Sequence, residues 1–334
     1  MKSLQKKLNK IDIIYVSIEN LDSLNKINDL FCHGILFEPD NKIEYFYAGV
    51  YFDIIEKKFK IAKKYYLTAI DHGDIHAMYN LGMHYRDIKN YTKAKKYFLM
   101  AIEHGNSLAM DSLAFYYEEI KKNYVKAEKY YLMAIGHGNS TSMYNLAVYF
   151  EDIKKNYVKA EKYYLMAIEH GNSSAMNNLA WHYENVKKNY RKSKKYYLMA
   201  IKHGNVTAMY NLAIYYKDVK KNHVKTEKYY LMSIDHNYER SFNALFCHYK
   251  NIKNYEKLLK FCVKYYEHFD RSDVIYVIKT LWNSKLNSES NEHFIKLLLS
   301  FETFEDDTFS ISLRTFINVL HQKINTIKLH FEKK

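Results

Sequence analysis

A block of eight residues recurs along the chain at a nearly constant interval. Copies begin at Met110, Met143, Met176 and Met209, and each start lies 33 residues after the one before. Repeats with a period of about 20–50 residues are typical of arrays in which each unit is one supersecondary element. Such a unit cannot bury its apolar face alone, so neighbouring units must stack and share a core. The repeat therefore predicts a stacked array before any other property is considered.

Each repeat predicts two helices joined by a short turn. In both halves of one repeat, apolar residues recur at helical spacing: Met143, Leu146, Ala147 and Phe150 in the first half, and Ala160, Tyr164, Ala167 and Ile168 in the second. Asn156 stands where the second helix should begin, and Asn is a favoured N-cap residue. His170 and Gly171 follow that helix, and glycine is the residue that most often supplies the left-handed C-terminal cap.

The composition supports an all-α fold. The 334 residues include 1 Pro and 9 Gly, which is too few turn residues for a β-sandwich or an α/β fold of this length. An earlier copy of the block begins at Met78, and degenerate copies begin at Tyr45 and Phe242. We therefore expect about seven repeats, spanning residues 42–270.

The repeat resembles a known family. Leu81, Gly82, Tyr85, Ala94, Phe98 and Ala101 are similar to the signature of tetratricopeptide repeats. The four-residue steps of Ala101, Gly105, Ala109 and Leu113 resemble the Sel-one-like subclass in particular. The resemblance implies a right-handed α-solenoid of stacked antiparallel helical hairpins. Residues 1–41 are then expected to form an N-terminal cap, or a degenerate repeat, and residues 271–334 a helical C-terminal cap.

The residues give no sign of catalysis. Cys32, Cys247 and Cys262 have no metal-ligand spacing, and the sequence contains no glycine-rich phosphate loop and no H-E-x-x-H motif. We expect a protein that is not an enzyme, with no cofactor and no metal. The sequence shows no signal peptide and no stretch of about 18 apolar residues. We therefore expect an intracellular, cytoplasmic location, with no secretion and no membrane insertion.

The resemblance also implies a binding surface for a protein or peptide partner. In tetratricopeptide proteins the first helix of each hairpin lines a concave groove, so the residues that vary there between repeats are candidates for contact. They are Tyr79, Asn80, Met83, Asp111, Phe115, Tyr144, Asn145, Val148, Asn177, Asn178, Trp181, Tyr210, Asn211 and Ile214. The recurring asparagines among them either bind a peptide backbone or bridge neighbouring helices. Glu118, Glu151, Asp152 and Glu184 are expected at one rim of this groove.

A second candidate surface is basic. The chain has a formal net charge of +14, and lysine pairs occupy the predicted turns: Lys121, Lys122, Lys154, Lys155, Lys187, Lys188, Lys220 and Lys221. This basic ridge is either a solvated edge, with pairs such as Glu118–Lys122 at i,i+4, or a site for single-stranded RNA. We expect a protein-interaction scaffold or adaptor, with RNA binding as the alternative.

Overall fold

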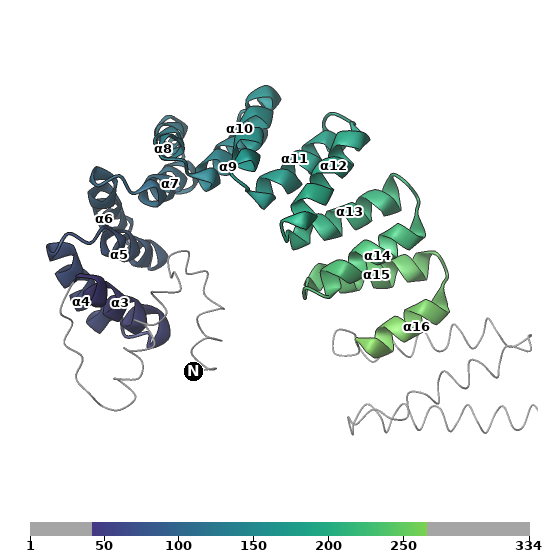
Figure 1. Cartoon of the computed structure of the whole chain (residues 1–334), viewed down its shortest axis with the longest axis horizontal. Coiled ribbons are helices and arrows are strands. Elements are labelled where there is room, and N and C mark those ends of the chain that lie inside the picture. The colour runs from purple at the N-terminus through teal and green to yellow at the C-terminus, as the bar shows by residue number, and fades with distance from the viewer. Residues whose placement is uncertain (1–41, 266–334) are drawn as a thin grey trace, which may run out of the picture. The chain divides into compact units, whose positions relative to one another are not determined.

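The structure is a computed structural model that describes residues 42–265. This part of the chain contains helices and no strand. In chain order the helices are α3 (Lys42–Val50), η1 (Tyr51–Ile55), α4 (Phe59–Asp71), α5 (Ile75–Asp87), α6 (Tyr91–Glu103), α7 (Ser107–Phe115), η2 (Tyr116–Ile120), α8 (Tyr124–Gly136), α9 (Ser140–Val148), η3 (Tyr149–Ile153), α10 (Tyr157–Glu169), α11 (Ser173–Asn185), α12 (Tyr190–Lys202), α13 (Val206–Asp218), α14 (His223–Ile234), α15 (Glu239–Asn251) and α16 (Tyr255–Lys264). Figure 1 shows them in order.

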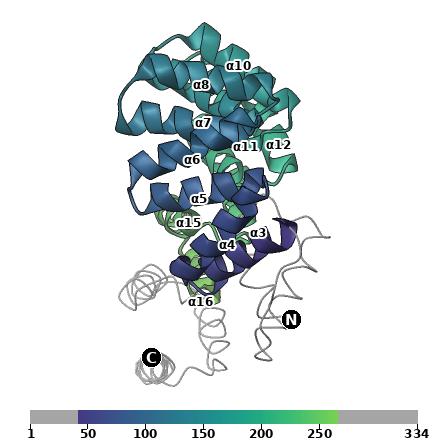
Figure 2. The same ribbon diagram turned by 90° about the vertical axis from the view of Figure 1, so that its left-hand side faces the viewer.

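The helices form seven consecutive hairpins within residues 42–265, which confirms the predicted all-α repeat fold. The chain divides into two compact units, and each is described by itself: unit 1 ends at Tyr196 and unit 2 begins at Tyr197, inside α12. Figure 2 shows unit 1 from the side, with α3 to α8 following one another. The caps predicted for residues 1–41 and 271–334 lie outside the described residues.

The link from one hairpin to the next is closed by capping. After α8, Gly138 has a φ of 75°, a left-handed conformation that glycine adopts without steric cost. Its N–H donates to the carbonyl of Ile135 over 2.9 Å, and the N–H of Asn139 donates to Ala134 over 3.1 Å. These two bonds form a Schellman motif. The Asn139 side chain then accepts from the N–H of Ser142 over 2.9 Å and caps α9.

The turn inside most hairpins is wider than an α-helical end. In η2 the N–H of Lys121 donates to the carbonyl of Tyr116, five residues back, and Asn123 donates to Tyr117, six residues back. The hairpin of α5 and α6 has one residue fewer, and there Asn90 donates to Tyr85, five residues back. A π-type turn therefore absorbs the extra residue of the longer repeats.

Small residues let the two helices of a hairpin approach each other. Leu146 and Ala147 are fully buried against Tyr164, which is also fully buried. A second aromatic pair closes the hairpin, since the rings of Phe150 and Tyr163 stack at 5.6 Å. In the α5–α6 hairpin the small residue is Gly82, where an added Cβ would lie 2.7 Å from the Phe98 ring. Each hairpin depends on such contacts with its neighbours for a continuous core.

Candidate protein-binding face

The first helices of unit 1 present one apolar side chain per hairpin. Met83, Phe115, Val148 and Trp181 occupy the same position in α5, α7, α9 and α11, and we call them the apolar row. Phe115 is 48% exposed and Trp181 is 47% exposed, whereas Met83 and Val148 are half-buried. Two large aromatic side chains therefore stand in solvent, two hairpins apart.

The polar residues beside the apolar row are bonded within the protein. Asp111 Oδ1 accepts from Ser142 Oγ over 2.7 Å and from Asn145 Nδ2 over 3.1 Å, which joins α7 to α9. Asn178 Nδ2 donates to the Tyr144 hydroxyl over 3.2 Å, which joins α9 to α11. The asparagines were predicted either to bind a peptide backbone or to bridge helices. Asn145 and Asn178 bridge neighbouring helices.

Burial is the largest cause of the pKa shifts of Asp111 and Tyr144. It raises the pKa of Asp111, while the hydrogen bonds from Ser142 and Asn145 act in the opposite direction. Burial likewise raises the pKa of Tyr144, against the bond from Asn178. Both side chains therefore form hydrogen bonds within unit 1.

The remaining predicted residues lie on the same helices but are less exposed. Tyr79 is half-buried, with its ring 6.1 Å from that of Phe98, and Asn80 is also half-buried. Asn177 is buried and donates to Asn178 over 3.2 Å. In unit 2, Tyr210 packs against the rings of Tyr230 and Tyr238, and both Asn211 and Ile214 are half-buried.

Two glutamates expected at the rim point into the core instead. Glu118 accepts from the Tyr131 hydroxyl over 2.7 Å, and Glu151 accepts from the Tyr164 hydroxyl over 2.6 Å. Glu151 also lies 2.7 Å from Nδ1 of the fully buried His182 in the next hairpin. The rim prediction was therefore wrong for both, because each carboxylate accepts a hydrogen bond from a buried tyrosine of the second helix.

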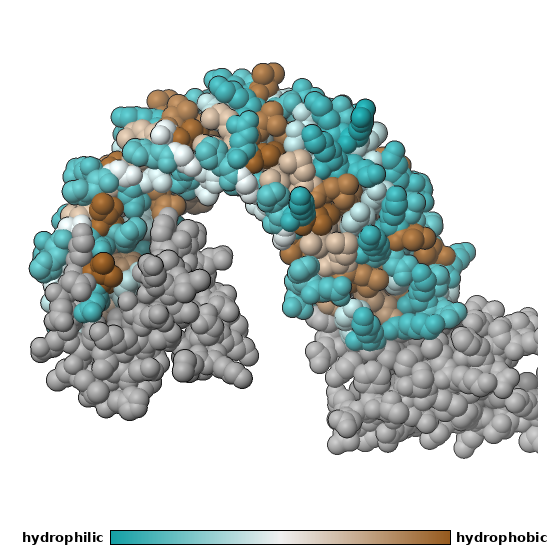
Figure 3. Space-filling model, viewed as in Figure 1, coloured by the Kyte–Doolittle hydropathy of each residue, from teal (hydrophilic) through white to brown (hydrophobic). Residues whose placement is uncertain are grey.

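The basic ridge lies at the hairpin turns. All eight of its lysines are exposed, and the second lysine of each pair has a positive φ, between 48° at Lys122 and 52° at Lys155. The predicted Glu118–Lys122 pair does not form, since Lys122 Nζ bonds to Glu119 over 3.1 Å. Lys154 lies over the Tyr149 ring at 5.8 Å. Figure 3 shows hydrophilic residues over much of the visible surface of the described part, with hydrophobic patches between them.

Comparison with known families identifies the repeat. Six consecutive segments match the Sel1 repeat, at residues 44–74, 75–106, 107–139, 140–172, 173–205 and 206–238. The chain belongs to the Sel1 repeat family. Proteins built from these repeats and from tetratricopeptide repeats are generally protein-interaction scaffolds. The seventh hairpin, α15 and α16, follows the six matched Sel1 repeats.

Solved structures agree with a Sel1 repeat fold. The crystal structure of a Sel1 repeat protein from Oxalobacter formigenes is 23% identical, with a TM-score of 0.51 over 64% of this chain and 99% of that chain. The crystal structure of c5321, a protective antigen present in uropathogenic Escherichia coli strains and displaying an SLR fold, is 17% identical. Its TM-score is 0.51 over 79% of this chain and 64% of that chain. No curated protein matches the sequence.

Two kinds of feature are absent from the described part of this Sel1 repeat protein: a cluster of metal ligands and a membrane-spanning helix. Residues 42–265 contain no group of three or more His, Cys, Asp or Glu side chains placed to hold a metal ion. His182 and Glu151 form a buried pair without a third such ligand beside them. None of the helices in this range combines the length and the apolar character needed to cross a bilayer.

Proposed function

We propose that the chain is a non-catalytic scaffold that binds a peptide segment or helix of a partner protein along the apolar row of unit 1. The observation that carries this proposal is the exposure of Phe115 and Trp181 on a face whose polar neighbours are already bonded. Trp is enriched among binding hot spots, and Phe is enriched at protein interfaces. A partner that covers them removes apolar surface from water without breaking the Asp111–Asn145 or Tyr144–Asn178 bonds.

Rigid positioning favours such a site. The helices that hold Phe115 and Trp181 are fixed by buried neighbours, such as Leu113 and Leu179, which are both fully buried. A preformed surface loses little conformational freedom when a partner binds, and this spares part of the usual cost of association. The face therefore needs no rearrangement to present its two aromatic anchors.

The spacing of the anchors constrains the partner. Packed helices lie about 8–10 Å apart, so two steps along the row span roughly 20 Å. An extended strand rises about 3.3 Å per residue and a helix about 1.5 Å. An extended partner would place its two apolar anchors about six residues apart, and a helical partner about thirteen.

A peptide-display selection on the full chain tests this proposal. Enriched peptides are expected to carry two large apolar residues at one of these spacings. They should bind a folded Phe115→Ala/Trp181→Ala double variant at least about tenfold more weakly, because each truncated hot spot costs more than about 1 kcal/mol. The control is Val158→Ala, which truncates a still more exposed apolar side chain, 77% exposed, on a second helix outside the row. Equal binding to the double variant and the control would reject this face as the binding site.

The alternative, RNA binding through the basic ridge, uses different residues and has a different salt response. Neutralising several phosphates makes affinity fall steeply with added salt, whereas an apolar contact does not. Titration of the full chain with a single-stranded homopolymer from about 50 to 200 mM salt therefore separates the two. The Lys121→Ala/Lys122→Ala variant should lower RNA affinity only if the ridge is the site.

A further inference from the structure

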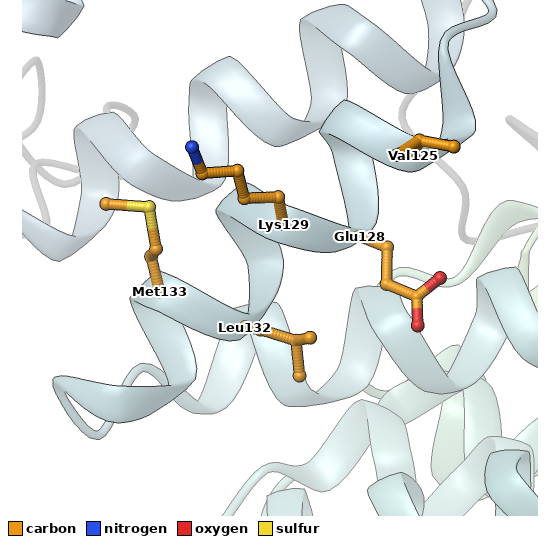
Figure 4. A pocket seen from close by; sticks show the side chains of 5 residues that line it. All are labelled: Val125, Glu128, Lys129, Leu132 and Met133. Carbon is orange, nitrogen blue, oxygen red and sulfur yellow. The ribbon is translucent and has the colours of Figure 1, made fainter.

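The second helix of the third hairpin, α8, has an unusually bare outer face. Val125 is 82% exposed, Leu132 is 43% exposed and Met133 is 36% exposed. These residues line a surface hollow together with Glu128 and Lys129, and Figure 4 shows that all five side chains come from this one helix. Because they fall at i, i+3, i+4, i+7 and i+8, they form one continuous stripe, the α8 stripe.

A glycine at its end distinguishes α8 from the other second helices of its kind. The Leu-Met pair of α8, Leu132 and Met133, is exposed at both residues. In α6 and α10 both residues of the equivalent pair are half-buried. Those helices end in Glu103 and Glu169, one turn beyond the leucine, whereas α8 ends in Gly136. In α12, which ends in Lys202, the equivalent Met199 is half-buried although Leu198 stays 39% exposed, so a side chain at this place mainly shields the methionine.

Neither the backbone nor the packing requires that glycine. Gly136 is not among the residues of positive φ, and a Cβ added there would meet nothing within 4 Å. Glycine also weakens a helix relative to other residues. The result of having glycine at this place is therefore an open apolar surface.

The charges in the middle of the stripe also lack strong partners. Glu161, the counterpart of Glu128 in α10, accepts a hydrogen bond from Tyr183, and Glu227 in α14 bonds to Lys257. Glu128 itself has neither a hydrogen bond nor an ion pair among the described residues, and Lys129 lies over the Tyr130 ring at 5.9 Å. Glu128 and Lys129 thus lie next to each other at the centre of the stripe, and both can form ion pairs with a binding partner.

We propose that the α8 stripe binds the α8 stripe of a second copy of this chain, with the two helices antiparallel about a twofold axis. An axis between Glu128 and Lys129 places Glu128 opposite Lys129 of the second copy, and Lys129 opposite Glu128. The same axis places Val125 opposite Leu132 of the second copy. A twofold interface requires this kind of self-complementary patch; here the charge order and the Val125–Leu132 pair satisfy it, and Met133 falls opposite Tyr124 at the end of the helix.

The expected dimer is weak. One helix face covers less than the roughly 800 Å² per partner of a standard stable interface. We therefore expect dissociation in the micromolar range or above, with subunits that exchange readily. The chain would double the number of apolar rows in one assembly, which raises avidity for a partner with repeated motifs.

Sedimentation equilibrium of the full chain, up to several hundred micromolar, tests the proposal. The wild type should show a reversible monomer–dimer equilibrium. Gly136→Glu should weaken it by about tenfold or more, although the helix itself should become more stable, so loss of fold cannot explain the loss of dimer. Val125→Glu should have the same effect on association, whereas Val158→Glu, its exposed counterpart on α10, should leave the dimer unchanged.

Charge-reversal variants at Glu128 and Lys129 provide the most stringent test. Glu128→Lys and Lys129→Glu should each weaken the dimer, because each places like charges opposite one another. The double variant restores opposite charges across the twofold axis and should recover the wild-type dissociation constant to within about threefold. A strictly monomeric wild type, a dimer unaffected by Gly136→Glu, or a double variant no better than the singles would overturn the proposal.

Discussion

The lengths and surroundings of the buried tyrosine–carboxylate hydrogen bonds predict the order in which Tyr→Phe variants lose stability. Removing only the hydroxyl, by Tyr→Phe, deletes one donor and leaves the ring in place. The Tyr131 hydroxyl reaches Glu118 over 2.7 Å, and Tyr164 reaches Glu151 over 2.6 Å, both in buried surroundings. A hydrogen bond to a charged group contributes about 1.5–3 kcal/mol. For a protein of this size each kcal/mol shifts the melting temperature by about 2–4 °C, so a loss of 2 kcal/mol corresponds to about 4–8 °C.

The same substitution in the first hairpin supplies the matched control. The Tyr66 hydroxyl lies 3.5 Å from Asp53, well beyond the usual O–H···O distance, and Asp53 also lies 3.0 Å from His84 Nδ1. The Asn80 side chain also bonds with the Tyr66 hydroxyl, so Tyr66→Phe removes this neutral bond and a weak one to Asp53 and should cost about 1 kcal/mol, less than the loss at a tyrosine with a short bond to glutamate. Tyr131→Phe should cost most, and Tyr164→Phe should fall between them because His182 still contacts Glu151.

The loss in Tyr131→Phe should also depend on pH. Burial raises the pKa of Glu118 above its ordinary 4.5, and the Tyr131 bond opposes that rise. Without the bond the pKa rises further, so the folded state binds a proton more tightly. Stability then falls more steeply as the pH rises through the range above 4.5. Urea unfolding at several pH values measures both effects. Equal losses at all three tyrosines, or a Tyr131→Phe loss that grows toward low pH, would refute the reasoning.

Three further predictions concern backbone, charge and packing. Lys122→Gly should raise the free energy of unfolding by about 0.5–1 kcal/mol, because Lys122 has a left-handed φ of 48°. Lys121→Gly should lower the free energy of unfolding, because Lys121 has an ordinary φ of −93°. Chemical denaturation of the two variants measures the difference. Burial raises the pKa of Asp111 above 3.8, so stability should decline as the pH rises through its folded pKa, and Asp111→Asn should flatten that decline in a pH series of melting temperatures. Gly82→Ala should destabilise by about 1–3 kcal/mol through overpacking, whereas Gly136→Ala, with open space, should stabilise by about 1 kcal/mol; opposite signs in calorimetry confirm the difference.

The parts of the fold that depend on local chemistry could be predicted from the sequence. The ends of the second helices are an example, since His137, Gly138 and Asn139 carry their capping preferences wherever they occur. The Leu–Ala and Tyr spacing likewise predicts the buried face of each helix, because only one face can meet the neighbouring hairpin. Repetition strengthened both inferences by showing the same pattern several times.

The carboxylates could not be placed by the same reasoning. An i,i+4 rule considers only one helix and assigns Glu118 to Lys122, but the structure assigns it to Tyr131 on the next helix. Part of the signal was present: the residue opposite is Tyr131 or Tyr164 where Glu stands and Phe98 where Arg86 stands, although the fully buried Tyr230 keeps its hydroxyl opposite Lys217. A phenol without an acceptor is costly in the core, but the Lys217–Tyr230 repeat breaks the covariation, so sequence alone could not establish the bond.

The candidate binding face was located only in part. Periodicity placed Phe115 and Trp181 on the first helices, but it could not show which of the fourteen candidates are exposed. Exposure depends on how far successive helices approach each other, and hence on the bonds of Asp111 and Asn178 to their neighbours. Gly136 was overlooked because a missing side chain leaves no periodic signal.

In three hairpins the wide turn goes together with an acid in the interior. Asp53, Glu118 and Glu151 all lie in π-type segments, whereas the shorter turn after α5 has Arg86 at the same place and an apolar ring beneath it. Deleting one residue from a wide turn would therefore swing a buried acid away from its phenol. Exchange of whole hairpins between positions in the array should succeed more often than exchange of turns alone, because only the whole hairpin carries both halves of that match.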